Sequence, residues 1–161
     1  MTNYSDSSEP VFAGISRPDA EFHAAYGLAS STLPQFISLL DQREGAIFSA
    51  KLRFRDPDES ERIGEDRFAF IWLASVCYYP GDRVFSGVFF ELPAEFQKWH
   101  HVGQHHVFEP DEIFDWMVLR DGHLHGGFTL RVARSRIPES EREAYDQYIG
   151  VSVYEPHQTH D

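Results

Sequence analysis

The stretch DEIFDWMVLRDGHLHGGFTLRVAR, residues Asp111 to Arg134, decides the fold. At its centre the dipeptide Asp121-Gly122 lies between two apolar runs, which is typical of a type I′ turn because both central residues of that turn need a positive φ. The sequence therefore predicts a β-hairpin. Counting outward from the turn predicts one face that pairs Leu119 with Leu124, Met117 with Gly126, Asp115 with Phe128 and Ile113 with Leu130, and a second face that pairs Val118 with His125, Trp116 with Gly127 and Phe114 with Thr129.

This pairing places Asp115 in an apolar row, where a lone carboxylate costs free energy unless it is hydrogen-bonded or paired. One interpretation is structural: Asp115 accepts backbone N–H bonds or pairs with Arg131 or Arg53, as buried carboxylates usually do. The other is chemical: a raised pKa prepares Asp115 to act as a general acid or base.

Composition indicates one globular domain, because 161 residues with 42% hydrophobic and 15% aromatic residues can bury a sizeable core. The formal net charge of -12 would repel phosphate backbones, which argues against nucleic acid and favours a basic protein partner. The single Cys77 cannot form an internal disulfide. With no targeting segment and no long apolar run, the sequence predicts a cytoplasmic protein that does not enter a membrane.

Three segments are expected: a flexible arm over residues 1–15, one globular domain over 16–150 and a tail over 151–161. Ser16 and Asp19 have the spacing of a capping box, so a helix should follow them. Its apolar residues recur every three or four positions up to Leu40, and Pro34 predicts either a kink or two helices, the second capped by Ser31 or Thr32.

Downstream, the pattern changes to strands. The segment from Ala46 to Arg55 alternates and is predicted to be a half-buried strand whose polar face is a basic stripe. A charged loop, a buried strand, a second strand, a short turn, a brief strand and a final helix should occupy residues 56–66, 67–79, 84–91, 93–99, 105–108 and 138–149. The predicted fold is α+β: a strongly curved antiparallel sheet, or a small SH3-like barrel, with an N-terminal helix kinked at Pro34 and a C-terminal helix.

The order of these motifs resembles the YegJ-like bacterial family of unknown function that carries the number 2314. The resemblance covers most of Asp19 to Ile149 and implies a small bacterial domain without assigned chemistry, so it lends no catalytic residue. Its structural signature falls on Trp72, Gly87, Pro93, Gly103, Asp115, Trp116, Gly127, Thr129 and Arg131.

Histidines crowd the hairpin and the segment before it. His123 and His125 share a strand face, and His105 or His106 together with Asp121 would complete a metal site. The alternative is that these histidines are solvated, because no HExxH or spaced Cys/His motif accompanies them.

Two surfaces are candidate binding sites. The basic stripe of Lys51, Arg53 and Arg55 is suited to an anionic ligand, although a solvated face is the commoner outcome. Trp99 and Trp116 are the aromatic candidates for contact with a partner, with packing inside the domain as the alternative.

No nucleophile elbow and no phosphate-binding loop is present, so we assign no catalytic residue and expect no cofactor. The sequence favours a non-catalytic, acidic protein-binding module, of which an immunity protein that neutralises a toxin is one form. The alternatives are a metal-assisted hydrolase built on the histidines and a domain that binds a small anion through the basic stripe.

Overall fold

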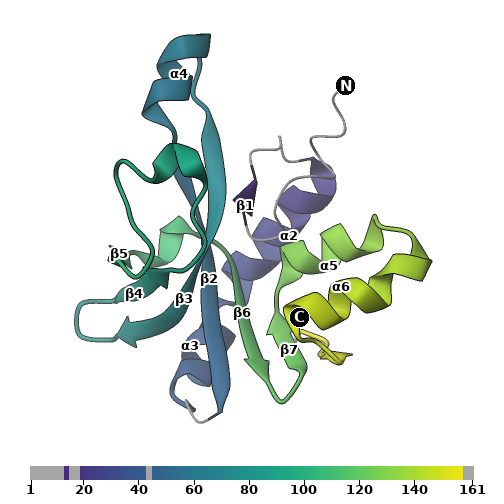
Figure 1. Cartoon of the computed structure of the whole chain (residues 1–161). Helices are drawn as coiled ribbons and strands as arrows, with labels where there is room; N and C mark the ends of the chain where they lie inside the picture. The colour runs from purple at the N-terminus through teal and green to yellow at the C-terminus, as the bar shows by residue number, and fades with distance from the viewer. Residues whose placement is uncertain (1–12, 15–18, 43–44, 158–161) are drawn as a thin grey trace.

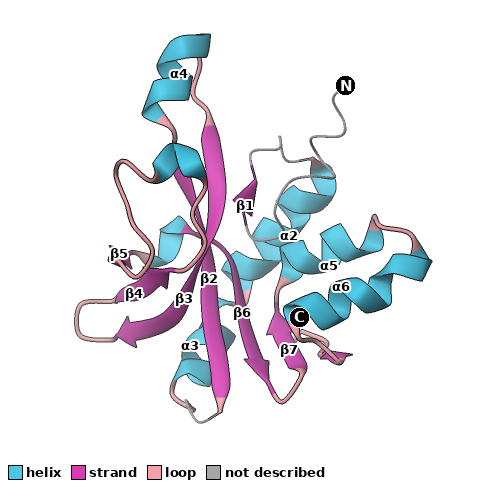
Figure 2. Cartoon of the chain, viewed as in Figure 1, coloured by secondary structure: helices cyan, strands magenta, loops and turns pink. Residues whose placement is uncertain are grey.

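The computed structural model describes residues 13–14, 19–42 and 45–157. Most of the predicted arm, and Ser16 of the predicted capping box, lie outside these residues. The chain forms an α+β domain in which a twisted sheet is flanked by helices (Figures 1 and 2). The strands are β1 (Ala13–Gly14), β2 (Ala46–Arg55), β3 (Phe68–Tyr79), β4 (Val84–Phe89), β5 (His105–Phe108), β6 (Ile113–Arg120), β7 (His123–Gly126) and β8 (Val153–Tyr154). The helices are α2 (Ala20–Ser31), α3 (Leu33–Leu40), α4 (Pro57–Ile63), α5 (Phe128–Ser135) and α6 (Arg142–Ile149), with short 3-10 turns η1 (Ala94–Phe96), η2 (Pro110–Glu112) and η3 (Glu139–Glu141).

The strand order is β5-β4-β3-β2-β6-β7-β8, and β1 pairs with β3. Neighbouring strands are antiparallel except β7 and β8, which are parallel. Because β5 and β8 lie at opposite ends of this order, the described strands form an open sheet. The predicted α+β class and antiparallel sheet are confirmed, whereas the SH3-like barrel is not what these strands form.

The hairpin turn is confirmed. Asp121 and Gly122 have φ values of 51° and 79°, and the strands on either side pair as predicted. The matched pairs are Met117 with Gly126, Val118 with His125 and Leu119 with Leu124.

The Gly127 N–H still donates to the Trp116 carbonyl at 2.6 Å, but past Gly127 the predicted pairing is wrong, because the second strand ends at Gly126 and the chain enters α5. Gly126 and Gly127 both adopt positive φ, 73° and 64°, which turns the backbone out of the sheet. Phe128, Thr129 and Leu130 therefore lie on a helix instead of opposite Asp115, Phe114 and Ile113.

The N-terminal helical segment divides into α2 and α3, as one of the two predicted alternatives for Pro34 requires. Asp19 caps α2 by accepting a hydrogen bond from the Phe22 N–H at 3.2 Å. Of β6, only the second half, Met117 to Arg120, pairs with β7, so on that side the first half of β6 is free to contact α2. There Tyr26 packs edge-on against Phe114, with ring centroids 5.1 Å apart.

Residues 56–66 were expected to form a charged loop, and this was wrong. Asp56 accepts a hydrogen bond from the Glu59 N–H at 3.0 Å, Pro57 occupies the first turn, and Gly64 ends α4 with φ 80°. These are ordinary start and stop signals of a helix.

Two apolar clusters form the core. The larger joins α2 and α3 to one face of the sheet, where Phe36 stacks on Trp116 with centroids 5.1 Å apart. The smaller packs α5 and α6 against the other face, around Trp72 and Leu124. Figure 1 shows α5 and α6 side by side near β7. The predicted final helix is confirmed as α6, although Tyr148, expected on its inner face, is 64% exposed.

Candidate functional site

The carboxylate of Asp115 is completely buried and lies at the N-terminus of α5. Its Oδ1 accepts hydrogen bonds from the backbone N–H groups of Trp116 (2.8 Å) and Phe128 (3.1 Å). Its Oδ2 accepts them from the N–H (2.7 Å) and the hydroxyl (2.5 Å) of Thr129. Because Gly127 occupies the N-cap position and has no side chain, Asp115 supplies the cap from the neighbouring strand.

Lys51 lies directly across from Asp115 in the register of β2 and β6. The bulge that follows Lys51 leaves Phe114 as the extra residue on β6. The Lys51 ammonium donates to the Thr129 hydroxyl at 3.2 Å, which links the amine to Asp115 through Thr129.

Aromatic rings surround this amine: its Nζ is 5.3 Å from the centroid of Phe70, 5.9 Å from Phe22 and 6.0 Å from Trp72. Burial lowers the pKa of Lys51 to about 8, although the charge of Asp115 opposes the shift. Burial also raises the pKa of Asp115, and the hydrogen bond from Thr129 and the charge of Lys51 partly offset that change.

With a pKa near 8, the Lys51 amine is able to act as a base or nucleophile close to neutral pH. The carboxylate of Asp115 is in a different position: it is closed off from solvent, and each of its oxygens already accepts two hydrogen bonds. This geometry favours the structural interpretation of Asp115, through backbone N–H groups. Arg131 instead donates to the carbonyl oxygens of Leu124, Gly126 and Glu155.

The predicted basic stripe has intramolecular partners along its length. Arg53 stacks over Phe68, with its guanidinium carbon 4.0 Å from the ring centroid, and Arg55 forms a 2.9 Å ion pair with Asp66. Since Lys51 points into the network described above, the three basic groups do not converge on a shared anion site.

The histidines are not brought together either. His105 and His106 lie on β5, His123 and His125 lie on β7, and β4, β3, β2 and β6 separate the two strands. Throughout the described ranges, no group of three or more His, Cys, Asp or Glu side chains is placed to hold a metal ion.

His106 has a different role, which the sequence did not indicate. Its ring packs near Phe54 and Phe89 together with His100, and burial lowers the pKa of both imidazoles.

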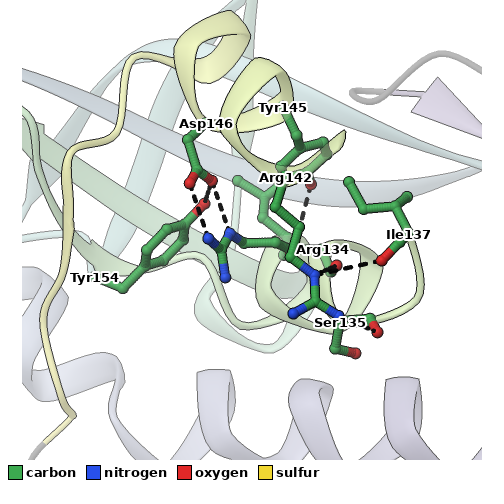
Figure 3. Close-up of polar contacts among 8 residues, drawn as sticks. Arg134, Ser135, Ile137, Arg142, Tyr145, Asp146 and Tyr154 are labelled. Atoms are coloured by element: carbon green, nitrogen blue, oxygen red, sulfur yellow. Dashed lines mark hydrogen bonds and ion pairs between the residues drawn. The ribbon is translucent and has the colours of Figure 1, made fainter. Parts of the chain in front are cut away.

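A second polar network joins α5, α6 and β8 (Figure 3). Arg134 binds both carboxylate oxygens of Asp146 at 2.8 and 2.9 Å, and the Tyr154 hydroxyl donates to the same carboxylate. The hydrogen bond from Arg134 lowers the pKa of Asp146. The Tyr145 hydroxyl donates to the Leu130 carbonyl at 3.1 Å, so this network holds the C-terminal segment against α5.

The surface around β5, which we call the β5 edge, comprises β5, the segment from Trp99 to Gln104 that precedes it, and η2 after it. Val102 and Val107 are 61% and 62% exposed, and Trp99 is 39% exposed. Exposed carboxylates follow directly at Glu109, Asp111 and Glu112. The β5 edge therefore combines apolar and acidic side chains.

Beside it, α4 and η1 enclose a shallow groove of about 230 Å³. Lys98 crosses the groove to form an ion pair with Asp58 and lies 5.2 Å from the ring centroid of Trp99. The groove is lined by Asp56, Asp58, Glu59, Ala94, Glu95 and Lys98.

Of the predicted aromatic contact residues, Trp99 is on this surface. Trp116 is in the core at 1% exposure, where its indole N–H donates to the Thr32 hydroxyl at 3.1 Å. Trp116 therefore cannot touch a partner. Its burial follows from its position opposite Ala50 on the sheet face that α3 covers.

The fold and these sites define a small α+β domain with an open sheet, a strand-capped helix and an acidic edge. The chain belongs to the bacterial family described as "Uncharacterized protein conserved in bacteria (DUF2314)", whose model matches residues 19–153. This confirms the family resemblance.

Two curated relatives are similar. A putative ankyrin repeat protein of Neisseria meningitidis serogroup B is 30% identical over 88 residues, which cover 55% of this chain and 34% of the relative. The uncharacterized protein YegJ of Escherichia coli is 25% identical over 109 residues, covering 68% of this chain and 64% of YegJ. The chain thus spans about a third of the first relative and under two thirds of the second. No solved structure matches the chain. Within the described residues, no helix has both the length and the apolar character needed to cross a bilayer.

Proposed function

We propose that the chain is a non-catalytic, acidic module that binds another protein through the β5 edge, and that this partner is basic. The observation that carries the proposal is the exposure of Val107, an apolar residue in the terminal strand of the sheet, beside a run of carboxylates. Exposed apolar side chains with a charged rim are typical of protein-binding surfaces.

Two further observations support this function. A formal net charge of -12 favours association with a basic protein, because opposite charges speed the encounter. One relative is described as a putative ankyrin repeat protein, and stacked repeats of that kind build extended binding surfaces. One form of such a module is a cytoplasmic immunity protein that neutralises a toxin.

The two alternatives have less support. A metal-assisted hydrolase requires histidines that four intervening strands keep apart. A small-anion site requires basic groups that already contact Thr129, Phe68 and Asp66.

The proposal is tested by photocrosslinking in the bacterium that encodes the protein. A benzophenone amino acid at Val107 should crosslink a discrete basic protein, identified by mass spectrometry. The same probe at Tyr148, which is equally exposed on α6, is the matched control. Equal products from both positions, or none from Val107, would contradict the proposal. For the immunity form, expression of the identified partner in cells that lack this chain should slow growth.

A further inference from the structure

We propose that β5 is a docking edge at which a lysine- or arginine-rich segment of another protein adds as a further β-strand. This inference rests on the proposed function and makes its binding mode specific. In strand addition, backbone hydrogen bonds contribute affinity, and alternate side chains contribute specificity.

The backbone of β5 is oriented for such an addition. The Gln104 carbonyl accepts a hydrogen bond from the Phe89 N–H at 3.1 Å, so Gln104 directs its carbonyl toward β4. Because the direction of the backbone groups alternates along an antiparallel strand, the N–H and C=O groups of His106 and Phe108 also point toward β4. There His106 pairs with Gly87 and Phe108 pairs with Phe85. The N–H and C=O groups of His105 and Val107 therefore point to the opposite side, where no strand of the described residues is paired.

The side chains of β5 leave this edge accessible. His105 and Val107 lie on the same side of the strand and are both exposed. Proteins commonly protect edge strands with lysine, proline or a covering element, and β5 contains neither lysine nor proline. The edge thus offers unpaired backbone groups beside an apolar side chain.

Charge selects the occupant. Glu109, Asp111 and Glu112 follow β5 directly and are exposed. A second copy of this chain is disfavoured as the occupant, because two copies that each carry a formal net charge of -12 repel one another. A basic segment has the charge opposite to these carboxylates, of which Glu109 and Glu112 also form the capping box of η2, and its apolar residues would contact Val107.

The test uses the full-length protein and a short synthetic peptide of alternating lysine and valine, with binding measured by calorimetry. A glutamate-valine peptide is the charge control. Val107→Pro removes one outward N–H and keeps the bonds to β4, whereas Val107→Thr keeps the N–H at a similar volume. We expect Val107→Pro to weaken binding by about tenfold or more and Val107→Thr to change it by less than about threefold. Circular dichroism checks the fold of both variants.

Hydrogen exchange on the unmodified protein is an independent readout that does not depend on a variant. The lysine peptide should slow exchange of the His105 and Val107 amides and leave that of the Tyr148 amide, which lies within α6, unchanged. If Val107→Pro binds the peptide as well as the wild type and these amides are not protected, strand addition is overturned, while binding of a protein partner still stands on the crosslinking result. If the glutamate peptide binds as tightly as the lysine peptide, the proposal that the added segment is basic is overturned. If neither peptide binds, the proposal that β5 is a docking edge is overturned.

Discussion

The carboxylate of Asp115 on β6 binds both the backbone N–H and the hydroxyl of Thr129 on α5, at 2.7 and 2.5 Å. A strand residue thus caps a helix that begins two residues after β7 ends. The hairpin and α5 therefore form one hydrogen-bonded unit, and the contact that joins them is fully buried.

Replacement of Asp115 by Asn should destabilise the protein and leave its surface unchanged, because the side chain is buried. The amide offers one acceptor oxygen where the carboxylate offers two, so buried N–H or O–H donors lose their partner. We expect the free energy of unfolding in urea to fall by about 2–4 kcal/mol. Asp111→Asn, on the exposed turn η2, is the control and should change it by less than about 0.5 kcal/mol. A stability of Asp115→Asn equal to that of the control would show that the cap is dispensable.

Gly126→Ala should be strongly destabilising. Its φ is +73°, and a Cβ atom there would lie 2.4 Å from the Trp116 carbonyl oxygen and 2.7 Å from the Trp116 ring. Since backbone and a buried indole cannot move aside cheaply, we expect a loss of about 3 kcal/mol or more.

Gly27→Ala is the matched control for this substitution. Gly27 is inside α2, and a Cβ atom there would meet nothing within 4 Å. Alanine should raise stability by up to about 1 kcal/mol, because it is the better helix former. Thermal unfolding of the two variants should therefore shift in opposite directions, and an unchanged or raised unfolding temperature for Gly126→Ala would contradict the close packing at Gly126.

Because of Lys51, the free energy of unfolding should depend on pH in the alkaline range. Its pKa falls from 10.5 in the unfolded chain to about 8 in the folded protein. Between these values the unfolded chain retains a proton that the folded chain has released, so stability rises with pH.

Lys51→Met removes this titration. The wild-type free energy of unfolding minus that of the variant should therefore increase from pH 8 to pH 10.5, the interval set by the two pKa values. We expect an increase on the order of 2 kcal/mol, measured by urea unfolding. Lys98→Met, at an exposed ion pair, is the control. A flat difference would mean that Lys51 is as well hydrated in the folded protein as in the unfolded chain.

Thr32→Val should destabilise the protein by about 1–3 kcal/mol, because it leaves the buried Trp116 indole N–H without its acceptor. The exposed Ser31 provides the control as Ser31→Ala, which should change stability by less than about 0.5 kcal/mol. Equal effects in chemical denaturation would argue against the indole hydrogen bond.

The hairpin turn was predictable because its signal is local: an Asp-Gly pair between apolar runs. The helix after it was not, because Phe128, Thr129 and Val132 favour strands by propensity. What selects the helix is a tertiary contact, the cap from Asp115, which is 14 residues away from Thr129. Helix α4 was missed for a different reason. Its signals, Asp56, Pro57 and Gly64, are all in the sequence, but its charge resembles that of a loop.

The candidate sites were predictable in position more than in role. Alternation correctly placed Lys51 on the polar face of β2, yet nothing local indicates that Phe22 of α2 and Thr129 of α5 cover that face. The histidine grouping failed because closeness in sequence does not reveal that β5 and β7 lie toward opposite ends of the sheet. The exposure of Val107 likewise becomes visible only from the strand order.

The three tryptophans occupy separate environments: Trp116 in the larger apolar cluster, Trp72 in the smaller one and Trp99 at the surface. Their fluorescence should differ accordingly, with blue-shifted emission from the two buried indoles and red-shifted, quenchable emission from Trp99. Each variant that retains a single tryptophan would thus report optically on one environment: the larger apolar cluster, the smaller one, or the β5 edge and its occupation.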